Sequence, residues 1–121
     1  KDNLIPITGP IGKEFRQRLE EIRQGTIKPD DLRGGTFTIT NLGSYDVQGF
    51  TPVINLPELA ILGMGKIDSK PVVREGQVVI RKMMTLSLVF DHRLVDGAPA
   101  AKFLQHIKEL VETPNEVMFT K

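Results

Sequence analysis

The spacing of apolar and polar residues predicts a helix near each end of the chain. Over residues 13–24 apolar side chains recur three and four positions apart with charged residues between them, which is typical of an amphipathic helix, and Gly25 is a common stop signal. The same spacing over residues 97–113 predicts a second helix, which Pro114 ends. Glycines and prolines interrupt any regular pattern in residues 4–12, so this segment is expected to be short and extended.

Runs of β-branched, aromatic and aliphatic residues between these helices predict strands. They cover residues 36–40, 59–65, 71–74, 77–80 and 83–90. The runs at 59–65 and 83–90 are mainly apolar, which indicates buried strands, the first of them buried on both faces. Glu75 and Gly76 predict the turn of a β-hairpin, and residues 41–57 are expected to form a long loop with one short strand. The fold class is therefore mixed α/β, a mixed sheet with helices.

Composition limits the class of protein. The 121 residues include 16 Lys plus Arg and 15 Asp plus Glu, a formal net charge of +1, and 40% of them are hydrophobic, which is typical of one compact globular domain. Without an excess of positive charge, no nucleic-acid partner is expected. The longest apolar runs are far shorter than the roughly 20 residues that cross a bilayer, so no membrane span is expected either.

The chain has no cysteine, which excludes disulfides, thiolate metal ligands and a protein thiol nucleophile. This composition favours a reducing compartment, and we expect a prokaryotic cytoplasm rather than a mitochondrial matrix. The first residues include no initiator methionine, signal peptide or transit pattern, so the chain is expected to begin at a processed end or to be a fragment.

Two patterns that could suggest phosphate or metal binding do not meet the requirements of those sites. Residues 63–66 lack the spacing of a phosphate-binding loop, and Ile67 stands where such a loop needs a hydroxyl group. His92 and His106 have no second ligand at the helical spacing of a zinc site, so no metal is expected. His106 is expected to be a solvated residue on the charged side of its helix.

His92 lies at the junction between the last predicted strand and the second helix. Such a junction holds a side chain in place and leaves it accessible. Asp96 is placed to be the N-cap of the helix, and an orienting role for its carboxylate also stays open. From the residues alone, His92 is either a boundary histidine or a catalytic base, and Thr40 is a threonine at the end of a strand.

Three motifs in order resemble one family. Residues 91–97, DHRLVDG, resemble the D-H-R-x-x-D-G signature of the acyltransferase (E2) component of 2-oxo acid dehydrogenase complexes, the dihydrolipoamide acyltransferases. Residues 34–43, GGTFTITNLG, and 57–63, PELAILG, are similar to two further segments of that family. The resemblance covers nearly the whole chain and identifies residues 1–121 as the C-terminal part of the catalytic domain, with no lipoyl domain and no peripheral-subunit-binding domain.

The resemblance implies a chloramphenicol-acetyltransferase-like fold, present here as an incomplete domain because about the first half of the usual catalytic domain is absent. It also implies a homotrimer within a larger E2 core, with each active site in a channel at the interface between two subunits. Coenzyme A would enter this channel from one end, and a lipoyl group carried on a separate domain would enter from the other. No metal is expected to take part. The E1 and E3 enzymes would bind through parts of the full chain that are absent from this sequence.

By the same resemblance, three residues carry the chemistry of acyl transfer between dihydrolipoamide and coenzyme A. His92 is the general base that removes the proton from the attacking thiol. Thr40 donates its hydroxyl hydrogen to the oxyanion of the tetrahedral intermediate. Asp96 holds the loop of His92 in shape, and the arginine that normally pairs with it belongs to the absent half of the domain.

The resemblance also places Asn41, Gly65 and Ile67 along the coenzyme A side of the channel. A glycine in the run 59–65 is expected where another backbone or a ligand comes close, and at Gly65 a missing side chain would let the backbone approach the ligand. Acetyl, succinyl and branched-chain acyl groups all stay compatible with the sequence. The alternative to an enzyme is a catalytically inactive assembly or scaffold fragment of the same core, which the missing half of the domain favours.

Overall fold

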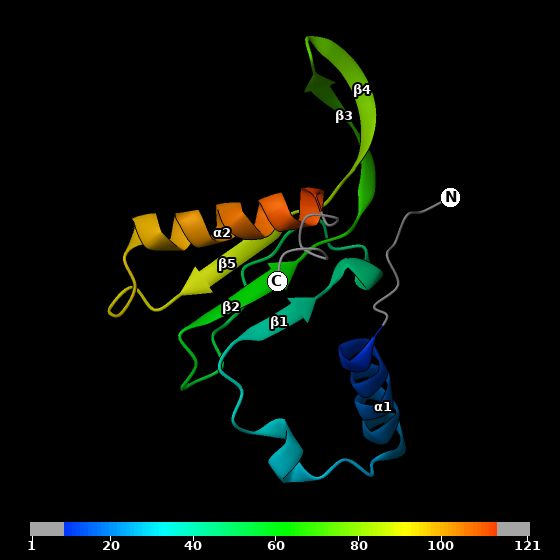
Figure 1. Ribbon diagram of the computed structural model, residues 1–121, viewed down its shortest axis with the longest axis vertical. Helices are drawn as coiled ribbons and strands as arrows, with labels where there is room; N and C mark the ends of the chain where they lie inside the picture. Colours follow the sequence, from blue (N-terminus) through cyan, green and yellow to red (C-terminus); the bar gives the residue numbers. More distant parts are fainter. Residues whose placement is uncertain (1–8, 114–121) are drawn as a thin grey trace. The chain divides into compact units, whose positions relative to one another are not determined.

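The computed structural model describes residues 9–113, which belong to two units, one ending at Gly35 and the other beginning at Thr36 (Figure 1). The first unit holds one α-helix and a short 3-10 helix, and the second holds the strands and the other α-helix. None of the helices in this range has the length and apolar character that crossing a membrane requires.

In the first unit, α1 (Pro10–Gln24) is the helix that the apolar spacing predicts. It begins three residues earlier than expected because Pro10 occupies the first turn, where a missing N–H leaves no hydrogen bond unmade. The expectation of extended backbone is therefore wrong for residues 10–12, and residues 4–8 lie outside the described part of the chain. Gly25 ends the helix as predicted, in the left-handed conformation with φ of 69°.

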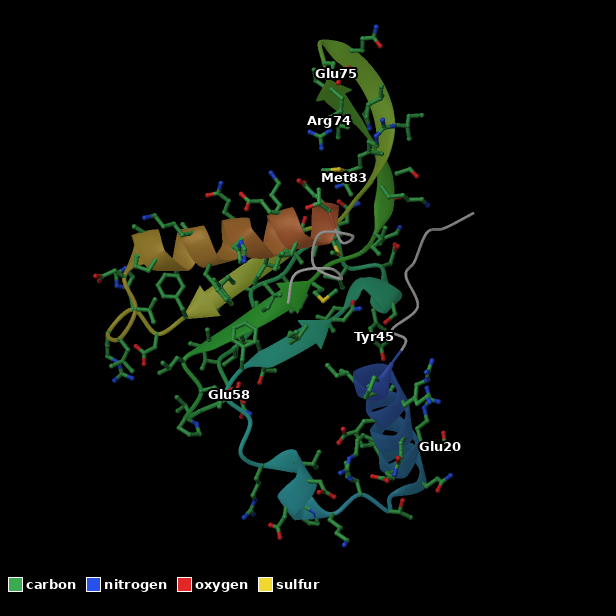
Figure 2. The ribbon with its side chains drawn as sticks, viewed as in Figure 1. Glu20, Tyr45, Glu58, Arg74, Glu75 and Met83 are labelled. Carbon is green, nitrogen blue, oxygen red and sulfur yellow. The ribbon has the colours of Figure 1, made fainter. Side chains whose placement is uncertain are left out.

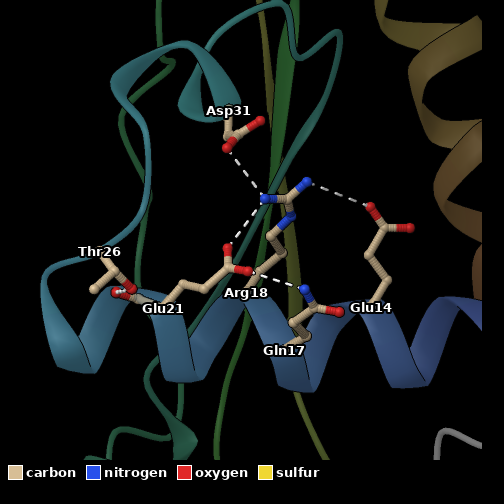
Figure 3. A network of polar contacts seen from close by, with 6 residues as sticks. All are labelled: Glu14, Gln17, Arg18, Glu21, Thr26 and Asp31. Atoms are coloured by element: carbon tan, nitrogen blue, oxygen red, sulfur yellow. Dashed lines mark hydrogen bonds and ion pairs between the residues drawn. The ribbon is translucent and has the colours of Figure 1, made fainter.

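Arg18 connects α1 to the short 3-10 helix η1 (Pro29–Leu32) of the same unit (Figure 3). Its guanidinium group lies 3.0 Å from the carboxylate of Glu21 and 3.1 Å from that of Asp31, with Glu14 at 3.9 Å. The hydrogen bond to Glu21 is the largest of the contacts that raise the pKa of Arg18. Because exposed ion pairs contribute little to stability, this network mainly orients η1.

The second unit is built on a three-stranded sheet in the order β1 (Thr38–Asn41), β2 (Ala60–Met64) and β5 (Leu86–Phe90). β1 runs parallel to β2, and β5 runs antiparallel to it. β2 is buried as its apolar run predicts, since Ile61 and Leu62 are only 5% and 4% exposed. β5 is an edge of this sheet and is half-buried along its length, which corrects the expectation of a fully buried strand.

The two faces of this sheet are covered by different elements. α2 (Gly97–Glu112) lies along β5 on one face (Figure 1), and its Phe103 ring meets the ring of Phe37 edge-on with centroids 5.9 Å apart. Side chains alternate between the faces of a strand, and Gly63 belongs to the opposite face. An added Cβ at Gly63 would lie 3.0 Å from the ring of Phe50, so the loop that carries Phe50 covers that face.

β3 (Asp68–Arg74) and β4 (Gln77–Met83) form the predicted hairpin, which is three residues longer at its open end on each strand than the apolar runs indicate. Glu75 and Gly76 at the turn have φ of 51° and 75°, the left-handed geometry that a two-residue hairpin turn requires. Figure 2 shows Glu75 at the tip of this two-stranded ribbon.

The segment before β2 and the start of β5 differ from the predictions, and β1 and β2 begin two residues and one residue later than expected. Residues 42–57 contain a 3-10 helix, η2 (Gly43–Tyr45), and no strand, so the expected short strand is wrong. The prolines of this stretch have no N–H to donate to a sheet. The last strand begins at Leu86 rather than Met83, because Met83 pairs within the hairpin.

Glu58 is a buried carboxylate just before β2, with 9% of its surface exposed (Figure 2). The hydroxyl of Thr38 donates a hydrogen bond to its Oε2 atom, and the N–H of Glu58 donates to the carbonyl of Asn55. A buried charged group without a hydrogen-bond partner is costly. The Thr38 hydroxyl therefore joins the first residue of β1 to the segment that leads into β2.

We expect Thr38→Val to lower the free energy of unfolding by about 1–3 kcal/mol, because valine keeps the size of the side chain and removes the hydrogen-bond donor to Glu58. Thr38→Ser keeps the donor and is the matched control. Chemical denaturation of the two variants and the wild type measures the difference. Equal losses in both variants would show that Glu58 does not depend on this hydroxyl.

Candidate active site

The residues between β5 and α2 form a tight loop around Asp91. Its backbone carbonyl accepts hydrogen bonds from the N–H groups of Leu94 and Val95, both at 3.0 Å. Its carboxylate accepts the backbone N–H of Arg93 at 3.0 Å and the guanidinium group, with 2.7 Å between Arg93 Nη2 and Asp91 Oδ2. The side-chain and backbone hydrogen bonds from Arg93 lower the pKa of Asp91 to about 2, so its carboxylate is ionised at neutral pH.

His92 stands on this loop with its side chain exposed. Its ring is tilted against the ring of Phe90, with centroids 5.6 Å apart, and its Nε2 atom lies 4.0 Å from the point where a Cβ on Gly97 would be. Within residues 9–113 no hydrogen bond occupies the imidazole. Its nitrogens are therefore available for proton transfer to and from a substrate.

Asp96 is the N-cap residue of α2 by position, with φ of −77° and ψ of 158°, but its carboxylate makes no hydrogen bond to the helix. The expectation of a side-chain cap is therefore wrong. The third helical position is Pro99, which has no N–H for a capping carboxylate to bind. The Asp96 side chain stays exposed beside the His92 loop, and its effect on that loop remains a prediction.

The other predicted binding residues meet at the opposite end of the sheet. Asn41, Gly65 and Ile67 line one hollow of about 330 Å³. Its remaining walls are formed by Gly43, Ser44, Met64, Lys66 and Met84. The Asn41 side chain turns back to accept a hydrogen bond from the N–H of Gly43 at 2.8 Å. The structure thus brings the three residues together, and the ligand of the hollow remains a prediction.

Lys66, in the wall of the hollow, is a residue that the sequence analysis missed. Its ammonium group lies 2.5 Å from Asp46 and 3.8 Å from Asp68, and the hydrogen bond to Asp46 raises the pKa of Lys66. Asp46 follows η2 in the left-handed conformation, with φ of 66°, which no sequence pattern indicates. Residues 9–113 bring together no group of three or more His, Asp or Glu side chains that could hold a metal ion.

Gly65 lies where another part of the backbone comes close, as the sequence predicts for the glycines of this run. A Cβ at this position would lie 2.0 Å from the carbonyl oxygen of Gln48 and 3.4 Å from that of Thr85. The chain's own backbone therefore fills the space on that side of Gly65. Gly65 also borders the hollow, and the approach of a ligand there remains a prediction.

Thr40 lies at the same end of the sheet as the hollow, and His92 lies at the other end. Thr40 is in register with Gly63, which pairs with Ser87 of β5, whereas His92 comes two residues after Phe90, the last residue of β5. Ser87 and Phe90 are about 10 Å apart along the strand, and β1 and β5 are about 10 Å apart across the sheet. Thr40 and His92 of one chain are therefore too far apart to act on one carbonyl group.

Residues 8–119 match the model of the 2-oxoacid dehydrogenases acyltransferase (catalytic domain) family, and the chain belongs to this family. It is 45% identical over 108 residues to the dihydrolipoyllysine-residue acetyltransferase component of the pyruvate dehydrogenase complex of Bacillus subtilis, and 45% identical over 104 residues to that of Staphylococcus aureus. These matches cover 89% and 86% of this chain and 24% of each relative. The chain thus spans about a quarter of the length of the curated relatives it matches.

Solved structures of relatives share the fold. The probable dihydrolipoamide acetyltransferase of Listeria monocytogenes has a TM-score of 0.82 at 38% identity, over 85% of this chain and 44% of that one. The dihydrolipoamide acetyltransferase of Azotobacter vinelandii has a TM-score of 0.85 at 35% identity, over 90% of this chain and 45% of that one. Both are catalytic cores of chloramphenicol-acetyltransferase-like fold, which confirms the predicted fold class.

We expect Gly65→Ala to lower the free energy of unfolding by about 1–3 kcal/mol, because the added methyl group overlaps the Gln48 backbone. Gly49→Ala is the matched control, since its Cβ would lie 3.5 Å from the methyl group of Thr85, an ordinary contact. Chemical denaturation of the two variants measures the effect. If they unfold at the same denaturant concentration, the close approach of Gln48 does not explain the glycine.

Proposed function

We propose that this chain supplies the catalytic base and the oxyanion donor of an acyltransferase that moves an acyl group between dihydrolipoamide and coenzyme A. One observation carries the proposal. The catalytic mechanism of the A. vinelandii relative has been investigated through a serine, a histidine and an asparagine. Thr40, His92 and Asp96 follow in the same order and at the same separations along this chain, with a hydroxyl, an imidazole and a side-chain oxygen at the matching positions.

His92 acts as the base in this proposal. It takes the proton from the thiol of coenzyme A, whose sulfur attacks the carbonyl carbon of the acyl thioester and forms a tetrahedral oxyanion. When this intermediate collapses, the bond from carbon to the dihydrolipoamide sulfur breaks, and the leaving thiolate takes the proton from the imidazolium. The exposed imidazole, which has no hydrogen-bond partner within residues 9–113, supports this role.

Thr40 supplies the hydrogen bond to the oxyanion. A fixed donor aimed at the developing negative charge contributes much of the rate enhancement in acyl transfer. Thr40 is half-buried within β1, where the strand pairing with Gly63 limits its movement. Threonine offers the same hydroxyl donor as the serine of the A. vinelandii relative.

Coenzyme A binds at the hollow lined by Asn41, Gly65 and Ile67, in this proposal. The family acts with coenzyme A and lipoyl groups, and the hollow lies next to Thr40 along β1. Lys66 also borders the hollow, but its ammonium group is paired with the carboxylates of Asp46 and Asp68, so the assignment rests on the lining residues and not on charge.

The site is shared between two copies of the chain, with His92 of one copy facing Thr40 of its neighbour. The distance between these residues within one chain supports this arrangement, and a homotrimer within a larger core is the assembly that we propose. Solved relatives include the cubic core of the pyruvate dehydrogenase multienzyme complex, with a TM-score of 0.84 at 34% identity.

The names of the relatives support a choice of acyl group, and the partners and compartment remain part of the proposal. Those of B. subtilis and S. aureus are acetyltransferase components of pyruvate dehydrogenase complexes, so we propose acetyl as the group transferred. A lipoyl domain would deliver it, the E1 and E3 enzymes would bind other parts of the whole protein, and the compartment would be a prokaryotic cytoplasm.

A catalytically inactive assembly or scaffold fragment is the second candidate. The observation that favours it is the small apolar core, which in the described part of the chain consists of Ile61, Leu62 and Ala100. Exposed apolar surface suits a chain that contributes mainly to assembly. A large particle that transfers no acyl group, measured by light scattering and by a thioester assay on the whole protein, would favour the scaffold.

We expect His92→Ala to lower kcat by about two to four orders of magnitude, the usual contribution of a positioned general base. Assembly should stay intact because the His92 side chain is exposed, and its one ring contact within residues 9–113 is with Phe90. A thioester-forming assay with dihydrolipoamide and coenzyme A measures the rate. His106→Ala, which changes an exposed histidine on α2, is the control. A His92→Ala variant that keeps more than a tenth of the rate would remove His92 from this role.

We expect Thr40→Val to lower kcat by roughly 10² to 10³, with little change in coenzyme A binding, because the variant loses the donor to the oxyanion. Thr40→Ser keeps the donor and should retain most of the activity. The same assay and a coenzyme A binding measurement test both effects. Equal rates for the two variants would show that the hydroxyl has no catalytic role.

A further inference from the structure

We infer that Asp91 is a positioning residue for His92. Its carboxylate holds Arg93, the residue that follows His92 in the chain, and thereby fixes the backbone on both sides of the histidine. This inference rests on the proposed function of His92. The Asp91 carboxylate is 16% exposed, and its hydrogen bonds all go to one residue. Arg93 supplies its backbone N–H at 3.0 Å, its Nε atom at 3.0 Å and its Nη2 atom at 2.7 Å. The residues immediately before and after His92 are thereby clamped together.

The backbone of Asp91 anchors the same loop to the sheet. Its N–H donates to the carbonyl of Leu59, just before β2, at 2.8 Å, and its carbonyl accepts the N–H groups of Leu94 and Val95. These bonds use backbone atoms only, so an alanine at position 91 can still make them. What the carboxylate adds to these bonds is a fixed backbone conformation from Asp91 through His92 to Arg93.

The imidazole depends on this backbone because little else fixes it. Its ring contact is with Phe90, and no hydrogen bond from residues 9–113 reaches it. An exposed ion pair contributes little to stability, and the Arg93 side chain is 83% exposed. A misplacement of a catalytic group by about 1 Å, in contrast, can lower a rate by about 10². Removing the clamp should therefore affect catalysis far more than folding.

The test compares Asp91→Ala, Arg93→Ala and the double variant in the whole protein. We expect Asp91→Ala to lower kcat by about 10- to 100-fold and to leave the KM values for coenzyme A and the acyl donor within about twofold. Arg93→Ala should lower kcat less, because its backbone N–H still reaches the carboxylate. The double variant should be no slower than Asp91→Ala, since the two side chains act as one unit.

Asp30→Ala is the matched control, because Asp30 is exposed and its carboxylate has no hydrogen bond or ion pair in the described range. It should match Asp91→Ala in melting temperature and particle mass, and match the wild type in kcat.

The outcomes separate this inference from the proposed function. If His92→Ala is inactive and Asp91→Ala keeps the wild-type kcat, the inference is wrong and the proposed function stands. If His92→Ala is fully active, the proposed function fails first. If Asp91→Ala does not fold, a role in the fold is shown instead, and Asp91→Asn, which keeps one acceptor oxygen, must still show a lower kcat at unchanged KM for the inference to hold.

Discussion

The register of β2 with its two neighbours is the constraint on which the proposed site depends. β1 runs parallel to β2 and ends beside the hollow, whereas β5 runs the opposite way and ends at the loop of His92. Because these two strands run in opposite directions, the residues that follow them lie at opposite ends of the sheet. Thr40 and His92 are therefore separated by the sheet itself, and no change of side-chain rotamer within one chain can bring them to the same carbonyl group.

Exposed apolar surface agrees with a site that needs more than one chain. Ile39 on β1 is 63% exposed, and Val78 and Ile80 on the hairpin are each 73% exposed. An isolated two-stranded hairpin is marginally stable in water, and β1 has an unpaired edge within the part of the chain that the structure describes. Such surface is usually covered by other protein. The chain spans less than half of the solved relatives, whose remaining parts and neighbouring copies are candidates for that cover.

Local patterns in the sequence predicted most of the helices and strands, whereas the outline of the site came from the family resemblance. The helical spacings, the Glu75–Gly76 turn and the apolar run of β2 depend on neighbours along the chain, and the structure confirms them. The resemblance grouped Asn41, Gly65 and Ile67, which share one hollow.

The contacts that sequence reasoning missed or misjudged have different physical causes. The backbone of Gln48 lies against Gly65, and the Thr38 hydroxyl donates to Glu58. Both contacts join segments that are far apart in the sequence, so no local pattern predicts them. The missing side-chain cap at Asp96 has a partial local cause, because Pro99 removes one of the two N–H groups that a capping carboxylate can bind.

The most direct test of a shared site is to mix two inactive variants of the whole protein, His92→Ala and Thr40→Val, under conditions where subunits exchange. If each site takes His92 from one copy and Thr40 from its neighbour, random mixing in equal amounts regenerates about a quarter of the sites, and activity should recover to about that fraction of wild type. Mixed assemblies that are shown to form and that recover no activity would contradict the account.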